Sequence, residues 1–327
     1  MGHASMGYSI IIPVFNSSLM LQELYQRLIT VMESLGEIFE VIFVEDCGSD
    51  NAWQLLQTIA QNDTRIIAIQ MFRNTGQGTA ILAGIAHSKG AFIITLDDDL
   101  QHPPEEIPVL INALRNNDSL DVVMGVSEVK CHNLFRRGCT ILINHLNIIF
   151  IKKPPHVQLT AFRIMRRQIA VELLKKNVPY PSIGPMLLSV TNRVNNILTE
   201  HHPRKKGKTG YTLFKLFRQG LSNIVGYSVM PLHILAVIGI GGIFCCTLFT
   251  IYLLSRYFIV GIHVPGWMTI LLMMIMFFSF NFLAFSLLGE YILRIMIIST
   301  TPSQWGVRHI INREIVNTRG RENMSEY

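Results

Sequence analysis

Three consecutive acidic residues, Asp97, Asp98 and Asp99, follow the apolar run AFIITL, and Gln101 comes two positions later. Carboxylates this close repel one another by up to several kcal/mol where the effective dielectric is low. A cation such as Mg²⁺ removes that repulsion, and it binds carboxylate oxygens while keeping substrate phosphates in its coordination shell. An acidic turn that caps the following helix gives the same pattern. The triplet therefore indicates either a divalent-cation site for a phosphorylated substrate or a helix cap.

Polar residues also follow two other apolar runs. Asn16 ends the run YSIIIPVF, and Glu45 with Asp46 ends the run VIFV. The sequence contains no Gly-x-x-x-x-Gly-Lys-Ser/Thr loop, and Gly76-Gln77-Gly78 lacks the spacing Gly-x-Gly-x-x-Gly. Those spacings bring glycine backbones close to nucleotide phosphates. A P-loop ATPase is therefore disfavoured.

The elements that position these residues alternate between strands and helices. Apolar runs predict strands over residues 8–15, 40–46, 65–72, 91–97 and 121–126. Helical periodicity, a glycine C-cap at Gly36 and the Pro103-Pro104 pair predict helices over residues 21–35, 52–61, 76–88 and 103–114. Strands separated by helices predict an α/β fold with a Rossmann-like, mostly parallel sheet. Ligands of such sheets bind at the carboxyl ends of the strands, where the acidic residues stand.

The apolar residues of the chain are concentrated near its C-terminal end. Half of the 327 residues (50%) are hydrophobic and 15% are charged, against about 25% charged in a typical soluble domain. This composition excludes a disordered chain. Two uncharged runs, 231–255 and 266–289, are each long enough for the roughly 20 residues that span a bilayer. They predict two transmembrane helices, at about 231–255 and 266–292, against the alternative of a pair of buried core helices.

The charges predict how these helices are oriented. The segment before the first span is rich in Lys and Arg, three arginines follow the second span, and the connector 257–265 has neither residue type. The positive-inside rule then places both termini and the large N-terminal part in the cytoplasm. The predicted organisation is a cytosolic domain over 1–210, an interfacial amphipathic helix over 211–229, the two spans within 230–298 and a cytosolic tail over 299–327, whose start is expected to dock as a strand.

Two further features of the composition bear on compartment and partners. The five cysteines fit no zinc or disulfide spacing, which suits reduced thiols in a cytosolic compartment. The net charge of +6 is compatible with nucleic acid, anionic lipid or phosphorylated substrates. Because part of this charge flanks the predicted spans, it indicates anionic lipid and substrate phosphates, and nucleic acid is no longer expected.

Taken in order, several motifs resemble the family-2 glycosyltransferases of the GT-A fold. They are Pro-Val-Phe-Asn, Val-Glu-Asp-x-Gly-Ser-Asp, Arg-Asn-x-Gly and Leu-Asp-Asp-Asp-Leu-Gln-x-Pro-Pro, followed by Arg136-Arg137, Phe162 to Arg167, Arg204 to Tyr211 and Leu287 to Ile292. The set is similar to polyprenyl-phosphate glycosyltransferases, including bacterial undecaprenyl-phosphate glucosyl- and aminoarabinosyl-transferases and dolichol-phosphate mannose synthases. It covers roughly residues 8–300.

The resemblance implies roles for particular residues. Asp97, Asp99 and Gln101 match a motif that binds Mg²⁺ or Mn²⁺, and Asp99 is also expected to be catalytic. Further residues match a nucleotide pocket or phosphate-binding positions: Pro13, Phe15, Glu45 and Asp46 for base and ribose, Arg136 and Arg204 as catalytic phosphate-holding arginines, and Thr209 near the diphosphate. Asp98 is given no role.

Four departures from the family pattern concern the substrate pockets. Ser17 stands where many relatives have Glu, and no Arg stands in the stretch 125–128. Gly210 replaces a frequent Lys, and Ala161 stands where some relatives have Asp. They leave the identity of the donor sugar open.

The implied activity is inverting transfer of a sugar from a nucleotide-diphosphate sugar, expected to be a UDP-sugar, to a polyprenyl (undecaprenyl) phosphate. The reaction is expected at the cytoplasmic face of a bacterial inner membrane, for envelope glycan or lipopolysaccharide modification, by a multi-pass protein. Relatives form homotetramers, so a homo-oligomer is expected. Two alternatives remain: a transferase that elongates a lipid-linked oligosaccharide, which needs a catalytic base, and a non-catalytic nucleotide-sugar-binding membrane subunit.

Overall fold

The computed structural model describes residues 7–127, 148, 153–200, 202, 266–300 and 305–312, with scattered residues between 230 and 259. The chain divides into two units. The first comprises Met1–Arg137, Lys153–Gly210 and Ser303–Tyr327, and the second comprises Gly138–Lys152 and Tyr211–Pro302.

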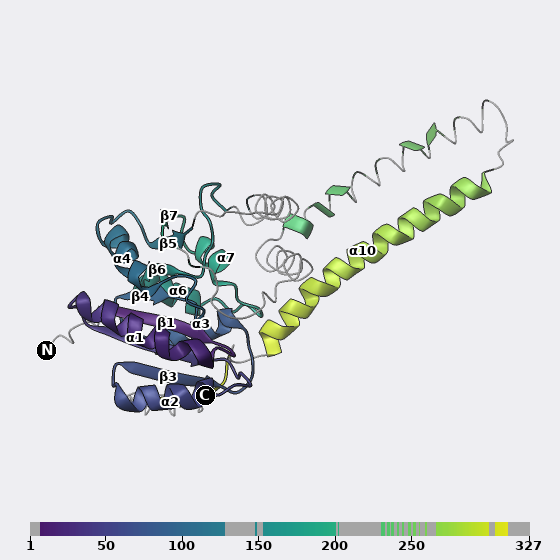
Figure 1. The fold of residues 1–327 in the computed structure, drawn as a ribbon. Helices are drawn as coiled ribbons and strands as arrows, with labels where there is room; N and C mark the ends of the chain where they lie inside the picture. The colour runs from purple at the N-terminus through teal and green to yellow at the C-terminus, as the bar shows by residue number, and fades with distance from the viewer. Residues whose placement is uncertain are drawn as a thin grey trace, which may run out of the picture. The chain divides into compact units, whose positions relative to one another are not determined.

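The first unit is built on an eight-stranded sheet with the order β7-β5-β6-β4-β1-β2-β3-β8 (Figure 1). The strands are β1 Tyr8–Val14, β2 Phe39–Glu45, β3 Ile66–Met71, β4 Phe92–Thr95, β5 Val122–Val126, β6 Arg163–Arg166, β7 Val194–Leu198 and β8 Val307–Ile311. β1 pairs in parallel with β2 and β4, β2 with β3, and β5 with β7. β6 runs antiparallel between β4 and β5, and β8 runs antiparallel to β3. The predicted mostly parallel α/β sheet is confirmed.

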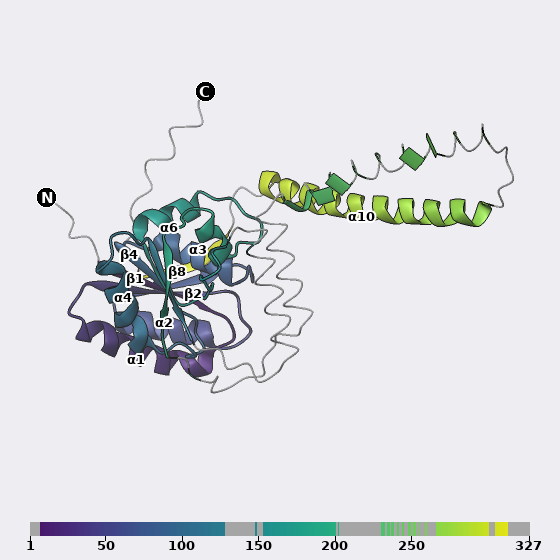
Figure 2. The ribbon, with the colours of Figure 1, turned by 90° about the horizontal axis from the view of Figure 1, so that it is seen from above.

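Helices cover both faces of this sheet (Figure 2). They are α1 Ser18–Ser34, α2 Ala52–Asn62, α3 Gln77–His87, η1 Pro104–Glu106, α4 Ile107–Arg115, α6 Arg167–Leu174 and α7 Ile183–Leu188. The main core joins α1, α2 and α4 to the alternate β1 residues Tyr8, Ile10 and Ile12. α3 covers the other face, where Gly84 lies against Ile11. All residues of β1 and β2 are buried, as expected for strands covered on both faces.

The structure adds elements between residues 163 and 198 that the sequence did not predict. β6 has four residues and begins and ends with Arg163 and Arg166. α6 and α7 have eight and six residues, and β7 has five. Elements this short carry too few apolar positions for a periodicity to be recognised. β6 nevertheless lies beside the central strands and places the Phe162 to Arg167 motif next to β4.

In the second unit, α10 spans Trp267–Thr300, which is 34 residues. Among the described residues it is the one helix long and apolar enough to cross a membrane, judged by length and composition, through the window Phe280–Ile297. This helix contains most of the second predicted span. Of the first predicted span the structure describes only scattered residues, all helical. The predicted interfacial helix over 211–229 lies outside the described residues.

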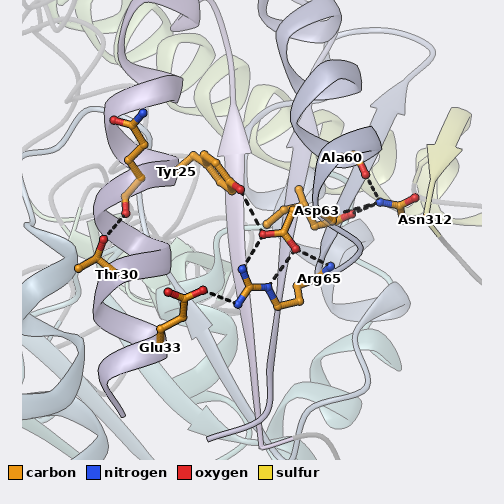
Figure 3. Close-up of polar contacts among 9 residues, drawn as sticks. Tyr25, Thr30, Glu33, Ala60, Asp63, Arg65 and Asn312 are labelled. Carbon is orange, nitrogen blue, oxygen red and sulfur yellow. Dashed lines mark hydrogen bonds and ion pairs between the residues drawn. The ribbon is translucent and has the colours of Figure 1, made fainter. Parts of the chain in front are cut away.

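β8 returns the chain from α10 to the edge of the sheet, where it pairs with β3. Asn312 follows β8 in a left-handed conformation, with φ of 63°. Its side-chain amide donates hydrogen bonds to the backbone oxygens of Ala60, Asp63 and Ile66 (Figure 3). The Asp63 carboxylate is in turn held by Arg65 at 2.8 Å and by Tyr25 at 3.1 Å. The start of the predicted C-terminal tail therefore docks as a strand and is closed by Asn312.

We predict that Asn312→Ala lowers the stability of the first unit, because buried backbone oxygens lose their donor at a cost of about 1–3 kcal/mol. Alanine also disfavours the left-handed backbone that asparagine tolerates. Thermal unfolding of the purified full chain is expected to shift down by several degrees. Asn62→Ala, which removes one exposed bond to the Thr58 oxygen, is the matched control. An equal shift in both variants would contradict this role for Asn312.

Candidate active site

The acidic residues meet where the central parallel strands end. β1, β2 and β4 are neighbours in the sheet, and their carboxyl ends lead into Phe15, Asp46 and Asp97. Three non-glycine residues directly beyond these strands have positive φ: Asn16 at 53°, Cys47 at 55° and Leu100 at 57°. Such conformations cost about 1–3 kcal/mol each and cluster at functional sites. The geometry of these turns therefore marks this edge as the candidate site.

The loop after β4 carries the predicted cation ligands. Asp97 Oδ1 accepts a hydrogen bond from Gln77 Nε2 at 2.5 Å. Asp99 Oδ1 accepts one from the backbone amide of Gln101 at 3.1 Å, and this bond tightens the turn. The structure thus places the three predicted ligands Asp97, Asp99 and Gln101 in one compact loop at the carboxyl end of β4.

The pKa of the Asp97 carboxyl group is far above the ordinary value of an aspartate. Burial raises the pKa of Asp97 to about 7, and the carboxylates of Asp99 and Asp98 add to that rise. Arg163, from the adjacent strand β6, acts against the rise. The Arg163 guanidinium is buried, with 5% of its surface exposed, and burial lowers its pKa to about 10. Arg163 therefore supplies positive charge beneath the acidic loop.

Asp46 organises the chain between β3 and α3. Its carboxylate accepts bonds from the backbone amide of Thr75 at 2.8 Å, from the Thr75 hydroxyl at 2.9 Å and from the Gly76 amide at 2.7 Å. Gly76 has a φ of 88°, which favours glycine there. Because Gln77 follows directly and binds Asp97, residues 75–77 connect the end of β2 to the end of β4.

Two further features shape this part of the site. Glu45 is buried at 2% exposure, and its Oε1 accepts a bond from the Gly48 amide. Its Oε2 is buried without a hydrogen-bond partner among the residues that the structure describes. At the start of α3, a Cβ on Gly78 would lie 1.9 Å from the Pro181 oxygen. Only glycine therefore allows the chain before α7 to pack against this helix.

The first strand contributes the two remaining described candidates. Pro13 is buried within β1. Pro13 has no backbone N–H to donate to a neighbouring strand. The pairing of β1 with β4 ends before it, at Ile11 and Thr95, so this ladder loses no hydrogen bond at Pro13. Phe15 keeps 49% of its surface exposed, and its backbone amide donates to Asp98 Oδ2 at 3.2 Å. Phe15 is therefore available for a ligand, whereas Pro13 shapes the strand end.

The three other predicted site residues, Arg136, Arg204 and Thr209, lie outside the described residues. The chain two positions before Arg204 is nevertheless fixed. The backbone amide of His202 donates to the Gln101 oxygen at 2.8 Å. His202 therefore lies against the acidic loop, and the roles predicted for Arg136, Arg204 and Thr209 stay predictions.

Four residues of the site were not selected from the sequence: Ser17, Thr75, Gln77 and Arg163. Ser17 was noted only as a departure from the family pattern, yet its hydroxyl donates to Asp98. Asp98, which was given no role, thereby joins two loops. Arg163 offered the clearest signal, because an arginine within an apolar strand requires a buried partner. Thr75 and Gln77 offered none, since their contacts depend on how distant loops fold.

A hard divalent cation fits this site. The donors are carboxylate and amide oxygens, which hard divalent cations prefer. Burial raises the pKa of Asp97, and the neighbouring carboxylates Asp99 and Asp98 add to that rise. Within the part of the chain that the structure describes, no three His, Cys, Asp or Glu side chains converge as a complete metal site. Mg²⁺ characteristically uses one or two protein carboxylates and completes its shell with water and substrate phosphate. Asp97, Asp99 and Gln101 would therefore hold the ion together with a ligand.

Comparisons with known proteins agree with this site. The sequence profile of the glycosyl transferase family 2 matches residues 9–174, which include all described site residues. The chain belongs to this family and is a glycosyltransferase. It is 32% identical over 297 residues to the undecaprenyl-phosphate 4-deoxy-4-formamido-L-arabinose transferase of Edwardsiella ictaluri, covering 88% of this chain and 89% of that protein. The transferase of the same name from Yersinia pestis is 33% identical over 293 residues and 88% of both chains.

The fold also matches solved structures. Glucosyl-3-phosphoglycerate synthase from Mycobacterium tuberculosis, in complex with phosphoglyceric acid, superposes with a TM-score of 0.52 at 14% identity, over 69% of this chain and 81% of that one. At this identity the match concerns the fold alone. It confirms the GT-A fold expected from the resemblance.

We predict that Mn²⁺ binding by the purified protein strengthens as the pH rises towards about 7 and then levels off. The pKa of Asp97 lies near that value, so below it the cation must displace a proton from the carboxyl group. Loss of one proton corresponds to about a tenfold change in apparent affinity per pH unit. Titration of Mn²⁺ by electron paramagnetic resonance between pH 5.5 and 8 measures this. Asp97→Asn is expected to bind weakly at every pH, and a flat profile for the unaltered protein would contradict the assignment.

Proposed function

We propose that this chain transfers a sugar from a UDP-sugar to undecaprenyl phosphate, with inversion at the anomeric carbon and with Mg²⁺ or Mn²⁺ bound. The observation that carries the proposal is the arrangement of side chains where the central parallel strands end. There the nucleotide candidate Asp46 and the cation candidate Asp97 are joined by residues 75–77. Relatives matched over 88% of the chain carry the name of undecaprenyl-phosphate transferases, which supports the acceptor.

The donor is proposed from the fold. Glucosyl-3-phosphoglycerate synthase has been solved with Mn²⁺, UDP-glucose and phosphoglyceric acid, with a TM-score of 0.50 to this chain. The exposed ring of Phe15 and the carboxylates of Glu45 and Asp46 lie where a base and ribose are expected. The Glu45 Oε2 atom, buried without a partner among the described residues, suits a donor group of the nucleotide.

The chemistry follows from the charges of the reactants. An oxygen of the lipid phosphate attacks the anomeric carbon, the bond from that carbon to the diphosphate breaks, and UDP leaves. The attacking phosphate is already anionic at neutral pH, so no side chain is needed as general base. A bound cation neutralises charge that develops on the departing diphosphate. Asp97, Asp99 and Gln101 hold it, and Arg136 and Arg204 are proposed to bind phosphate oxygens through their planar donor forks.

A membrane location with both termini on the cytoplasmic side is part of this proposal. β8 follows α10 in the chain and pairs with β3, which precedes it. Because β3 and β8 belong to one sheet, they must lie on the same side of a bilayer. If the segment between β3 and β8 crosses the membrane, it therefore crosses an even number of times. This supports the hairpin of two spans near 231–255 and 266–292, and it supports a C-terminal tail on the side of the catalytic domain.

The full chain, purified in detergent, is the material for the test. It is incubated with undecaprenyl phosphate, Mn²⁺ and a panel of labelled UDP-sugars that includes UDP-4-deoxy-4-formamido-L-arabinose and UDP-glucose. We predict that one donor moves its label into a chloroform-soluble product that mild acid releases. Asp99→Asn is expected to lower kcat by at least about a hundredfold, because the site loses a carboxylate for the cation.

The matched control is Asp118→Asn. Asp118 lies in the loop before β5, at the end of the sheet opposite the site. Its side chain is exposed and pairs with Arg166 of β6. This variant is expected to keep full activity. If no donor in the panel labels the lipid, or if Asp99→Asn stays fully active, the proposed transfer is wrong. A product that resists mild acid would favour elongation of a lipid-linked oligosaccharide.

A further inference from the structure

Asp98 is the one carboxylate of the acidic triplet that the proposed mechanism leaves unused. Its Oδ2 accepts a hydrogen bond from the Ser17 hydroxyl and a second from the Phe15 backbone amide at 3.2 Å. The donors precede Asp98 by 81 and 83 residues. Both therefore reach it through the fold and not through the local chain.

The place of this contact explains what it holds together. β1 and β4 are neighbours, but their ladder stops at Ile11 and Thr95. Beyond that pair β1 continues to Val14 in its pairing with β2 and then enters the loop that holds the exposed Phe15. The chain after β4 enters the loop that holds the predicted cation ligands. Asp98 bridges the two loops after backbone pairing has ended.

The contact also supplies two hydrogen-bond donors to the third carboxylate of the triplet. The two bonds offset part of the cost of burying that carboxylate. A carboxylate engaged by two donors is directed towards β1. It is then less available to compete with Asp97 and Asp99 for a cation.

We propose that Ser17 and Asp98 form a positioning pair, which fixes the Phe15 loop against the cation loop so that nucleotide and cation are bound in one geometry. The pair rests on the proposed function, because it assigns the nucleotide to one loop and the cation to the other. It acts through its neighbours and does not touch the reacting atoms. Its loss lowers nucleotide affinity more than it lowers the stability of the fold.

A double-mutant cycle tests the pair on the full chain in detergent, with UDP binding in saturating Mn²⁺ measured by calorimetry. Ser17→Ala removes the hydroxyl that donates to Asp98 and is expected to weaken UDP binding about three- to tenfold, because one of the two bonds is lost. Asp98→Ala removes the acceptor of both bonds and is expected to weaken UDP binding at least about tenfold, equivalent to about 1.4 kcal/mol.

The double variant Ser17→Ala/Asp98→Ala gives the decisive result. Because Ser17 is proposed to act through Asp98, the double variant is expected to bind UDP no more weakly than Asp98→Ala alone. Two residues that support the fold independently would instead add their effects. Thr30→Ala, which removes an exposed hydroxyl of α1 that donates to the Gln26 oxygen, is the matched control and is expected to bind UDP normally.

The single variant Ser17→Ala keeps the test decisive if Asp98→Ala does not fold. Normal UDP affinity in Ser17→Ala, or a double variant in which the two losses add in full, overturns the pair while the proposed function stands. If the unaltered protein binds neither UDP nor Mn²⁺, the proposed function fails, and the pair fails with it.

Discussion

The site depends on the burial and close spacing of carboxylates that parallel strands bring to one edge of a sheet. Asp97, Asp98 and Asp99 follow β4, and Asp46 follows β2, with β1 between the two strands. Each carboxylate in such a group needs donors or a cation. Asp46 is satisfied by Thr75 and Gly76, whereas Asp97 has one amide donor and a pKa raised to about 7. The remaining imbalance at Asp97 is what a bound cation corrects.

The same requirement explains why the surrounding chain is strained and closely packed. Asn16, Cys47 and Leu100 adopt left-handed conformations immediately beyond the three central strands. The Cys47 thiol donates to the Phe72 backbone oxygen at 3.7 Å. Its left-handed conformation belongs to the turn that presents Asp46. Gly78 admits the Pro181 backbone against α3, and residues 75–77 hold both Asp46 and Asp97. The strained turns and the contacts of residues 75–77 together hold the Asp46 and Asp97 carboxylates in place.

The sequence predicted the central strands and the acidic loop because both are local. Short apolar runs such as YSIIIPV and VIFV favour strands covered on both faces, and the carboxylates that follow them converge once the strands are parallel. The partners of those carboxylates were not predictable. Ser17 reaches Asp98 because β1 and β4 are neighbours, although 81 residues separate them in sequence. Arg163 reaches Asp97 because β6, a strand of four residues, inserts beside β4.

β8 connects the edge of the sheet to the segment of the chain that carries α10. It pairs with β3, and the backbone amide of Phe72, the first residue after β3, donates to the Gly306 oxygen at 3.1 Å. Phe72 begins the loop that ends at Thr75 and Gly76, the residues that bind Asp46. The chain that follows α10 therefore anchors one end of the loop that Asp46 holds at the other.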